Sequence, residues 1–357
     1  MLKRSKLGFL FVFFAIAAVA LFAAACGDDE ETAGTPRAGA TTPSAPREVF
    51  SFDMPWSQYN LILASLPAQV AIDKGFFEQE GLKPNILTTR GGGDTLQALL
   101  STGAPMAMMS PGAEINAINQ GQKLKIIWQS NKGGIVPLQG IVFCVKANSP
   151  VRSIQDLKGK KIAFTRPGSN TERLAKIMVQ RAGLSESDAT FISAGGIPEG
   201  VVLLDQGQVD VSTCAPEILA TKKYNAGEWR PLWTAQDGYP GFVENWMVVK
   251  EDFARQNPDR VKAFFRAIQK AVDWIDKNKN SEELVQIAAK LFRIPAEDLS
   301  ALRTRLKDYT DKAKQVWPLE LDRQGLEASV RLSVDTGELD KLPDSYDRYI
   351  DTSFARP

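Results

Sequence analysis

The feature that most constrains the fold of this chain is a unit of loop, helix, strand and loop that occurs twice. The first copy covers residues 90–114, where glycines lead into a helical pattern of leucines and then into the apolar run 106–109. The second copy covers residues 195–217, and Gly92 and Leu99 match Gly196 and Leu203. Two such units predict two similar α/β lobes rather than one large sheet. Chance similarity between two ordinary α/β units is the alternative.

The ends of both units are candidate ligand positions. Gly92 and Asp94 stand where the first helix should begin, and we expect Asp94 to cap it. Ser110 and Pro111 follow the first strand, and Glu217 follows the second. Open α/β sheets bind ligands beyond the carboxyl ends of their strands, so these residues are predicted to face a ligand. Glu217 could accept hydrogen bonds from a ligand amine or could pair with a lysine, and both interpretations stay open.

Residues 1–26 read as a targeting segment. A basic start is followed by an uncharged run to Ala25, and small residues then precede Cys26. This arrangement resembles the bacterial lipobox, with Ala23 where leucine is usual, and it predicts a lipid on Cys26. The run is also nearly long enough to cross a bilayer uncleaved. In both cases we expect the protein to be tethered outside the cytoplasmic membrane.

The next segment, 27–47, is a predicted disordered tether. It is rich in acidic residues, Thr, Ala, Gly and Pro and has no periodic apolar pattern, so it could not bury enough apolar surface to offset the entropy of ordering. Without the first 25 residues the formal net charge falls from +1 to −2. That balance offers no basic surface for nucleic acid.

Several motifs in the remaining chain resemble those of one protein family. Residues 71–82, AIDKGFFEQEGL, are similar to the "A-x-x-K-G-[FY]-F-x-x-x-G-L" motif of solute-binding proteins of ABC importers. The branch is the NMT1/SsuA-like one, which serves taurine, alkanesulfonates, nitrate and thiamine-precursor pyrimidines. Four further segments resemble motifs of this family and follow one another in the family's order. They are DLKGKK (156–161), PGSNT (167–171), GQVD (207–210) and DTSF (351–354).

This resemblance implies a type II periplasmic-binding-protein fold, in which two lobes, each with a central mixed β-sheet flanked by helices, are joined by a two-strand hinge. The implied boundaries are 48–142 with 247–357 for lobe 1 and 143–246 for lobe 2, with crossings at 140–146 and 246–250. It also implies a monomer that binds a small solute between the lobes and delivers it to ABC permease subunits. Periodic apolar residues also predict five helices, at 172–182, 258–275, 282–292, 296–314 and 323–336.

The turn at 166–171 is the strongest candidate for holding an anion. Gly168, Ser169, Asn170 and Thr171 precede a predicted helix, and a helix start offers unpaired N–H groups and a positive dipole end. Simple capping of the helix by Ser169 or Asn170 is the alternative. Arg166 could add charge to the site or could point to solvent.

Aromatic residues are the candidates for the other end of the ligand. Trp56, Tyr59 and Asn60 lie in what reads as the first strand–helix loop, where a ring could stack on a ligand. Asn245 and Trp246 stand at the start of the return crossing, and Trp246 could equally be a packing residue.

Enzymatic chemistry finds little support in this sequence. The chain contains no histidine, the usual general base for a serine or cysteine nucleophile and a common metal ligand. It has no Gly-x-Ser-x-Gly elbow, no phosphate loop and no dinucleotide-binding glycine pattern. We therefore predict no catalytic residue, no metal and no cofactor. Cys144 and Cys214 lie in apolar stretches of different units, so we expect buried free thiols rather than a disulfide.

The sequence thus predicts a membrane-tethered solute receptor. The expected ligand is a sulfonate, a nitrate-like anion, an aromatic acid, a pyrimidine or a related compound. Two alternatives stay open, a pyrimidine-precursor-synthesising enzyme with the same fold and a ligand-binding sensor module. The enzyme of that family relies on histidine, which this chain lacks.

Overall fold

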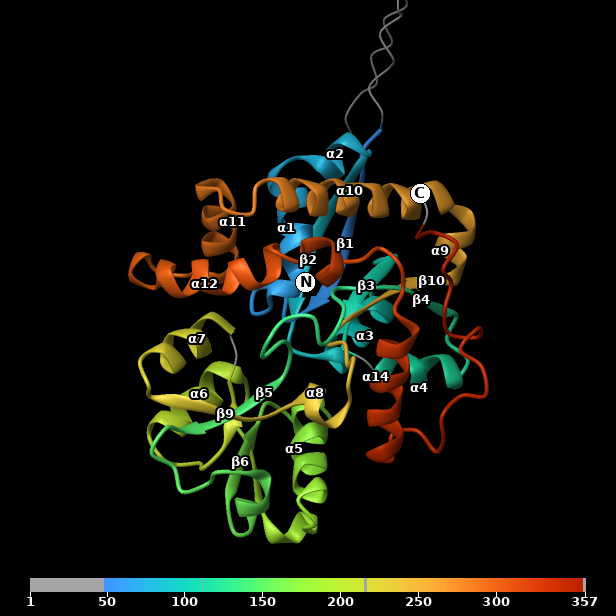
Figure 1. Cartoon of the computed structure of the whole chain (residues 1–357). Helices are drawn as coiled ribbons and strands as arrows, with labels where there is room; N and C mark the ends of the chain where they lie inside the picture. Colours follow the sequence, from blue (N-terminus) through green and yellow to red (C-terminus); the bar gives the residue numbers. More distant parts are fainter. Residues whose placement is uncertain (1–47, 111, 215–216, 356–357) are drawn as a thin grey trace, which may run out of the picture. The chain divides into compact units, whose positions relative to one another are not determined.

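The computed structural model describes residues 48–110, 112–214 and 217–355, without the side chains of residues 217–219 (Figure 1). The predicted targeting segment, the lipidation site Cys26, the tether and Pro111 lie outside the described residues. The side chain of Glu217 does so as well.

A five-stranded mixed sheet forms the centre of what we call lobe 1. Its strand order is β2-β1-β3-β10-β4. β1 pairs in parallel with β2 along its whole length, whereas β10 is antiparallel to both β3 and β4. The strands are β1 (Phe50–Ser57), β2 (Leu82–Thr89), β3 (Met106–Met109), β4 (Leu124–Gln129) and β10 (Trp246–Lys250). The chain leaves this sheet after β4 and returns to it at β10.

Two smaller sheets form lobe 2. One has the order β8-β5-β9 and is antiparallel, the other is the parallel pair β6-β7, and a bridge between Ile162 and Val211 lies between them. The strands are β5 (Val142–Lys146), β6 (Lys161–Phe164), β7 (Thr190–Ser193), β8 (Ser212–Thr213) and β9 (Trp229–Thr234). Residues 130–141 and 235–245 therefore connect the two lobes. The detailed lobe boundaries stay a prediction.

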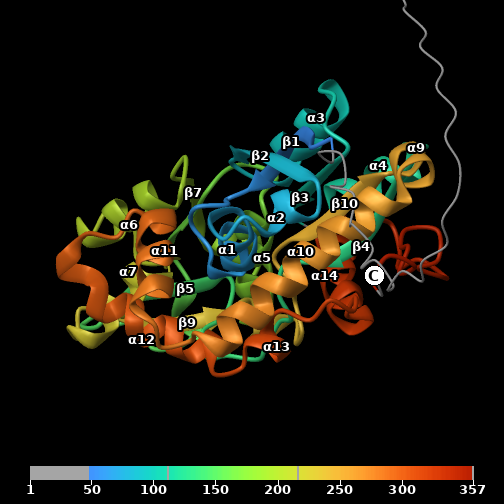
Figure 2. The ribbon, with the colours of Figure 1, turned by 90° about the horizontal axis from the view of Figure 1, so that it is seen from above.

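Helices cover the sheets of both lobes (Figures 1 and 2). In lobe 1 they are η1 (Leu63–Ser65), α1 (Leu66–Asp73), α2 (Phe76–Gln79), α3 (Gly92–Ser101), α4 (Ala113–Asn119), α9 (Glu251–Gln256), α10 (Pro258–Lys277), α11 (Glu282–Phe292), η4 (Ala296–Asp298), α12 (Leu299–Thr310) and α13 (Ala313–Val316). In lobe 2 they are η2 (Ile154–Leu157), α5 (Asn170–Arg181), η3 (Glu186–Asp188), α6 (Ile197–Asp205), α7 (Glu217–Asn225) and α8 (Ala235–Gly238). The last helix is α14 (Arg323–Asp335).

The repeated unit is present in both lobes. The helix and strand of the first copy are α3 and β3, and those of the second are α6 and β8; a further helix, α4 or α7, begins where each copy ends. One local prediction is wrong: α3 begins at Gly92 with Gly91 as its cap, so Asp94 lies in the first turn and is exposed. The extended backbone at Gly91 starts the helix before Asp94 can occupy the cap position. Asp94 still lies near the positive end of the helix dipole.

The core of lobe 1 is built largely on α10. Its Phe264, Phe265 and Ile268 are fully buried and pack in one cluster with residues of α1, β1 and α11. These positions recur at helical spacing, which is why the sequence pattern predicted this helix. Burying a phenylalanine or isoleucine side chain contributes about 1.5–3 kcal/mol, so α10 stabilises the whole lobe.

The helix α14 packs against both lobes. Leu326 and Val330 belong to a core cluster of lobe 1, whereas Ala328 and Leu332 belong to a cluster of lobe 2. The lobes also meet through α7 and α12, which lie side by side in both views (Figures 1 and 2). Close by, Lys222 of α7 forms an ion pair with Asp298 of η4.

The prediction of two buried free thiols is also wrong. Cys144 and Cys214 form a disulfide, with their Cα atoms 5.8 Å apart, and are not free thiols. The expectation failed because the stretches that carry them are neighbours in one sheet: β5 pairs with β8, and the Cys214 amide donates to the carbonyl of Val142. Adjacent strands bring the two Cα atoms within the range that a disulfide needs.

Candidate functional site

Two adjoining hollows lie where lobe 1 faces lobe 2, and together they form what we call the cleft. Their volumes are about 200 and about 290 Å³, and both are lined by Gln58, Arg90 and Thr165. Lobe 1 contributes the ends of β1 and β2 and the starts of α3 and α4. Lobe 2 contributes the turn after β6, the start of α5 and the loop before α6. Both copies of the repeated unit thus present a helix start to the same space.

The start of α5 is held by a network of hydroxyl groups. The Glu172 amide donates to Ser169 Oγ at 3.2 Å, which makes Ser169 the helix cap. The Thr165 amide donates to Thr171 Oγ1 at 2.9 Å, and the Thr165 hydroxyl lies 3.1 Å from that of Ser169. Because these side chains bond to one another, they fix the turn. The first amides of a helix have no acceptor within it, so the N–H groups at this helix start are suited to an anion.

Arginine side chains add positive charge to the cleft. Arg90 lines both hollows. Arg166 lines the second one, and its Nε donates to the carbonyl of Gly195 at 2.8 Å. This bond ties the turn after β6 to the loop before α6. Arg166 is therefore part of the cleft wall rather than a side chain directed only to solvent.

Gln58 is a cleft residue with an unusual backbone. Its φ is 55°, in the left-handed region that side chains other than glycine seldom adopt. Its amide donates to the carbonyl of Thr89 at 2.9 Å, which holds the ends of β1 and β2 together. Backbone strain of this kind is often found at binding sites. Nothing in the local sequence predicted it.

Arg173 connects the turn at α5 to lobe 1. Its guanidinium donates to the Asn170 side-chain oxygen and to the carbonyl of Gly168, each at 3.0 Å. It also donates to Glu338 Oε1 at 2.5 Å, just after α14. Arg173 and Glu338 both line the cleft, and sequence reasoning missed both. Their partners are distant in the sequence, so no local pattern could have identified them.

The structure brings together about half of the predicted ligand residues. Those that line the cleft are Gly92, Ser110, Arg166, Gly168, Ser169, Asn170 and Thr171. Six predicted ligand residues that the structure describes do not line the cleft: Trp56, Tyr59, Asn60, Asp94, Asn245 and Trp246. Asn245 and Trp246 are instead buried at the start of β10.

The prediction that Trp56 and Tyr59 are loop aromatics available to stack on a ligand is wrong. Trp56 lies inside β1, opposite Met108 of β3, and is 0% exposed. The two rings meet edge to face at 4.9 Å, and the Tyr59 hydroxyl donates to Gln69. The strand is longer than predicted because all eight residues of β1 pair with β2. These rings therefore form part of the core of lobe 1.

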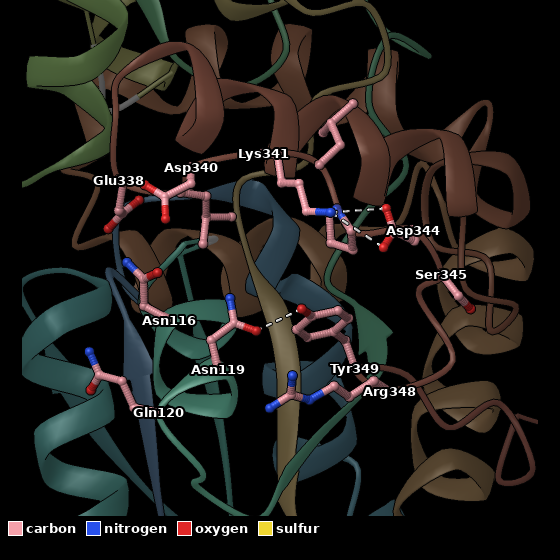
Figure 3. A pocket seen from close by; sticks show the side chains of 13 residues that line it. Asn116, Asn119, Gln120, Glu338, Asp340, Lys341, Asp344, Ser345, Arg348 and Tyr349 are labelled. Carbon is pink, nitrogen blue, oxygen red and sulfur yellow. Dashed lines mark hydrogen bonds and ion pairs between the residues drawn. The ribbon is translucent and has the colours of Figure 1, made fainter.

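A larger open hollow of about 660 Å³ lies outside the cleft, between α4 and the segment 338–349 (Figure 3). Two pairs of its side chains bond to each other: Tyr349 donates to Asn119 at 2.7 Å, and Lys341 pairs with Asp344. Figure 3 shows Glu338 and Asp340 at one end of this hollow. Glu338 lines both this hollow and the cleft.

Two further properties bear on what the described residues could do. None of their helices has the length and apolar character needed to cross a membrane. Within the same residues, no group of three or more acidic, cysteine or histidine side chains is arranged to hold a metal ion.

Comparison with known proteins gives similarities over most of the chain. The family model described as NMT1/THI5 like matches residues 64–281. The nitrate/nitrite binding protein NrtA of Synechococcus elongatus is 25% identical over 353 residues, covering 87% of this chain and 76% of NrtA. The 4-amino-5-hydroxymethyl-2-methylpyrimidine phosphate synthase THI11 of Saccharomyces cerevisiae is 22% identical over 219 residues, covering 59% of this chain and 63% of THI11.

Solved structures confirm the predicted fold class. The periplasmic aliphatic sulphonate binding protein SsuA from Escherichia coli matches with a TM-score of 0.65 at 17% identity, covering 87% of this chain and 94% of SsuA. This likeness shows the two-lobed periplasmic-binding-protein fold.

Proposed function

Because this chain belongs to the NMT1/THI5-like family, we propose that it is an extracytoplasmic solute-binding protein of an ABC importer. It takes a small anionic solute between its lobes and delivers that solute to the permease. Relatives named for nitrate and sulphonate binding support this proposal. Binding, rather than catalysis, is the role we assign to the cleft.

The observation that carries the proposal is the convergence of two helix starts on one cleft. Gly92 at the start of α3 belongs to lobe 1, and Asn170 at the start of α5 belongs to lobe 2. An anion between them would be attracted by both helix dipoles and by Arg90. A ligand that touches both lobes favours the closed form through its higher affinity for that form. Among the described lining residues there is no aromatic side chain, so we favour a small polar anion over a heteroaromatic ligand.

A thermal-shift screen tests this function. The panel comprises sulfonates, nitrate, aromatic acids, pyrimidines and flavins, and we expect a small anion to raise the unfolding temperature. Ligand at a hundredfold excess over Kd stabilises a protein by about 2.7 kcal/mol. Small-angle scattering with the same ligand should show a smaller radius of gyration. A panel in which no compound binds would contradict the proposal.

Replacing Arg90 with glutamine then tests the cleft itself. We expect the affinity for the anion to fall about fivefold, corresponding to about 1 kcal/mol for an exposed charge. Arg255→Gln in α9 is the matched control, since Arg255 lies in neither part of the cleft. Calorimetry should show parent-like binding for the control. Equal affinities for parent and Arg90→Gln would remove Arg90 from the site.

The membrane anchor is a separate part of the proposal. We expect Cys26 to carry lipid and to be the mature N-terminus, because small residues precede it after an uncharged run. Mass spectrometry of the protein from bacterial membranes should show the added acyl mass on Cys26. The Cys26→Ser variant should be released or misprocessed. An unmodified N-terminus at another residue would be the contrary result.

An enzyme with this fold is the second candidate, since one relative is named as a pyrimidine phosphate synthase. We rank it lower because this chain has no histidine, the residue on which the resemblance implies that this enzyme relies. Mass spectrometry of a bound solute distinguishes the two, since a binding protein returns the solute unchanged.

A further inference from the structure

Two ion pairs join side chains of lobe 1 to side chains of lobe 2. Arg173 of α5 pairs with Glu338, and Lys222 of α7 pairs with Asp298 of η4. In both views α7 lies well apart from α14, the helix that ends shortly before Glu338 (Figures 1 and 2). The lobes are therefore tied to each other at two separate places.

The Arg173–Glu338 pair connects the turn before α5 in lobe 2 to the start of α4 in lobe 1. Arg173 Nη2 donates to Glu338 Oε1 at 2.5 Å and to the carbonyl of Gly168 at 3.0 Å. Glu338 is held in lobe 1, because a Cβ atom placed on Gly112, the cap of α4, would lie 2.5 Å from Glu338 Oε2. The neighbouring Leu339 belongs to a core cluster of the same lobe. This ion pair therefore forms only when the two walls of the cleft come together.

The Lys222–Asp298 pair is part of a wider contact between α7 and α12, which directly follows η4. Burial raises the pKa of Tyr224 of α7, and the charge of the nearby Arg305 of α12 lowers it. Arg305 is 4% exposed and donates to the carbonyl of Leu138, in the outward connection between the lobes, at 3.0 Å. This part of lobe 2 thus packs on lobe 1 beside the connecting segment.

Both ion pairs consist of protein groups alone, so neither requires a solute. The side chains of Arg173 and Glu338 are 13% and 19% exposed, and water screens their attraction less than it would on an open surface. The side chain of Lys222 is 49% exposed, so salt should weaken its pair with Asp298 more strongly. Opening the cleft would separate both pairs.

We propose that these two ion pairs hold a fraction of the protein closed before any solute binds, and that ionic strength sets this fraction. Such closing does not depend on the chemistry of the solute, so it goes beyond the proposed function. It reduces the free energy that a solute must supply to close the lobes, and it raises the apparent affinity of every solute by the same factor. Lys222 and Asp298 line neither part of the cleft and act only through this equilibrium.

Distances between two spin labels on the solute-free full chain measure the closed fraction. Leu100 of α3 and Val202 of α6 are exposed, and the starts of their helices line the cleft from the two lobes. Cysteines at these two positions carry the labels. The Cys26→Ser replacement removes the remaining reactive thiol, because Cys144 and Cys214 are bonded to each other.

In dilute buffer we expect a shorter distance from closed molecules and a longer one from open molecules. Raising the salt concentration from about 0.1 M to about 1 M shortens the Debye length from about 10 Å to about 3 Å. The ratio of closed to open molecules should fall as a result. Glu338→Gln, which removes the charge of the less exposed pair, should lower the ratio at constant salt.

Exchanging the charges of Lys222 and Asp298 separates electrostatic attraction from packing. Lys222→Asp should lower the ratio of closed to open molecules about fivefold, the effect expected for a surface ion pair. Lys222→Asp/Asp298→Lys forms the pair with its charges reversed and should restore the parent ratio, which a purely structural role for these residues would not do. Lys123→Asp, in the exposed loop before β4, is the matched control and should keep the parent ratio.

A solute-free parent that shows only the longer distance in dilute buffer would overturn the inference. A ratio that changes neither with salt nor in the Lys222→Asp and Glu338→Gln variants would also overturn it. Circular dichroism checks that each variant is folded, and the salt titration of the parent decides the question if a variant is not. In every one of these outcomes a solute could still close the lobes, so the proposed function would stand.

Discussion

Removing the Cys144–Cys214 disulfide is expected to lower the free energy of unfolding by roughly 4 kcal/mol. The bridge closes a loop with a sequence separation of 70 residues, and the chain-entropy model gives about this value for such a loop. The loop contains β6, α5, β7 and α6, so the cross-link restricts most of lobe 2 in the unfolded chain. Both cysteines are buried, which keeps the bond away from solvent reductants.

The double variant Cys144→Ala/Cys214→Ala is the appropriate test, because a single replacement would leave a buried free thiol. The midpoint of guanidinium unfolding should move to a lower denaturant concentration in the variant. The chemically reduced parent should have the same midpoint as the variant. Peptide mapping without reductant should recover the two cysteines in one linked peptide. Identical unfolding midpoints for the oxidised parent and the double variant would contradict the expectation.

The disulfide also illustrates what sequence reasoning could and could not supply. Long amphipathic segments were predictable because their pattern is local: the helix predicted at 282–292 is α11 with the same bounds, and the one at 323–336 ends one residue earlier in α14. The pairing of β5 with β8 joins residues far apart in the chain, and β8 has only two residues. No local pattern places such a short strand beside its partner.

In the candidate site, too, features set by local sequence were predictable and features set by distant residues were not. The turn before α5 was predictable because Ser169 carries the local mark of a helix cap, and it does line the cleft. Glu338 was missed because the residue that places it, Arg173, precedes it by 165 positions. Trp56 was misplaced for a related reason: pairing with β2 extends its strand past the apolar run that marks its beginning.

The Glu114→Gln variant is expected to be more stable than the parent, by a margin that grows with pH. Burial raises the pKa of Glu114 from its ordinary 4.5 to about 8, so the folded protein keeps a proton that the unfolded chain releases in this range. Where the native state binds more protons, the free energy of unfolding falls as pH rises. The fall is at most about 1.4 kcal/mol for each pH unit, which gives an upper bound on the order of 5 kcal/mol by pH 8.

The direction of this effect can be checked at both ends of the range. Below pH 4.5 Glu114 is protonated in both states, so it contributes no pH dependence there, and above about pH 8 it is ionised in both states and the margin stays constant. Glutamine has nearly the same shape and carries no charge, so the variant should lack this slope. Urea unfolding between pH 5 and 9 measures the margin. Glu327→Gln, on the exposed face of α14, is the control for the change in net charge.

A margin that is constant from pH 5 to 9 would show that Glu114 titrates like an exposed carboxyl group. If the margin grows as expected, the parent retains a residue that weakens it at neutral pH.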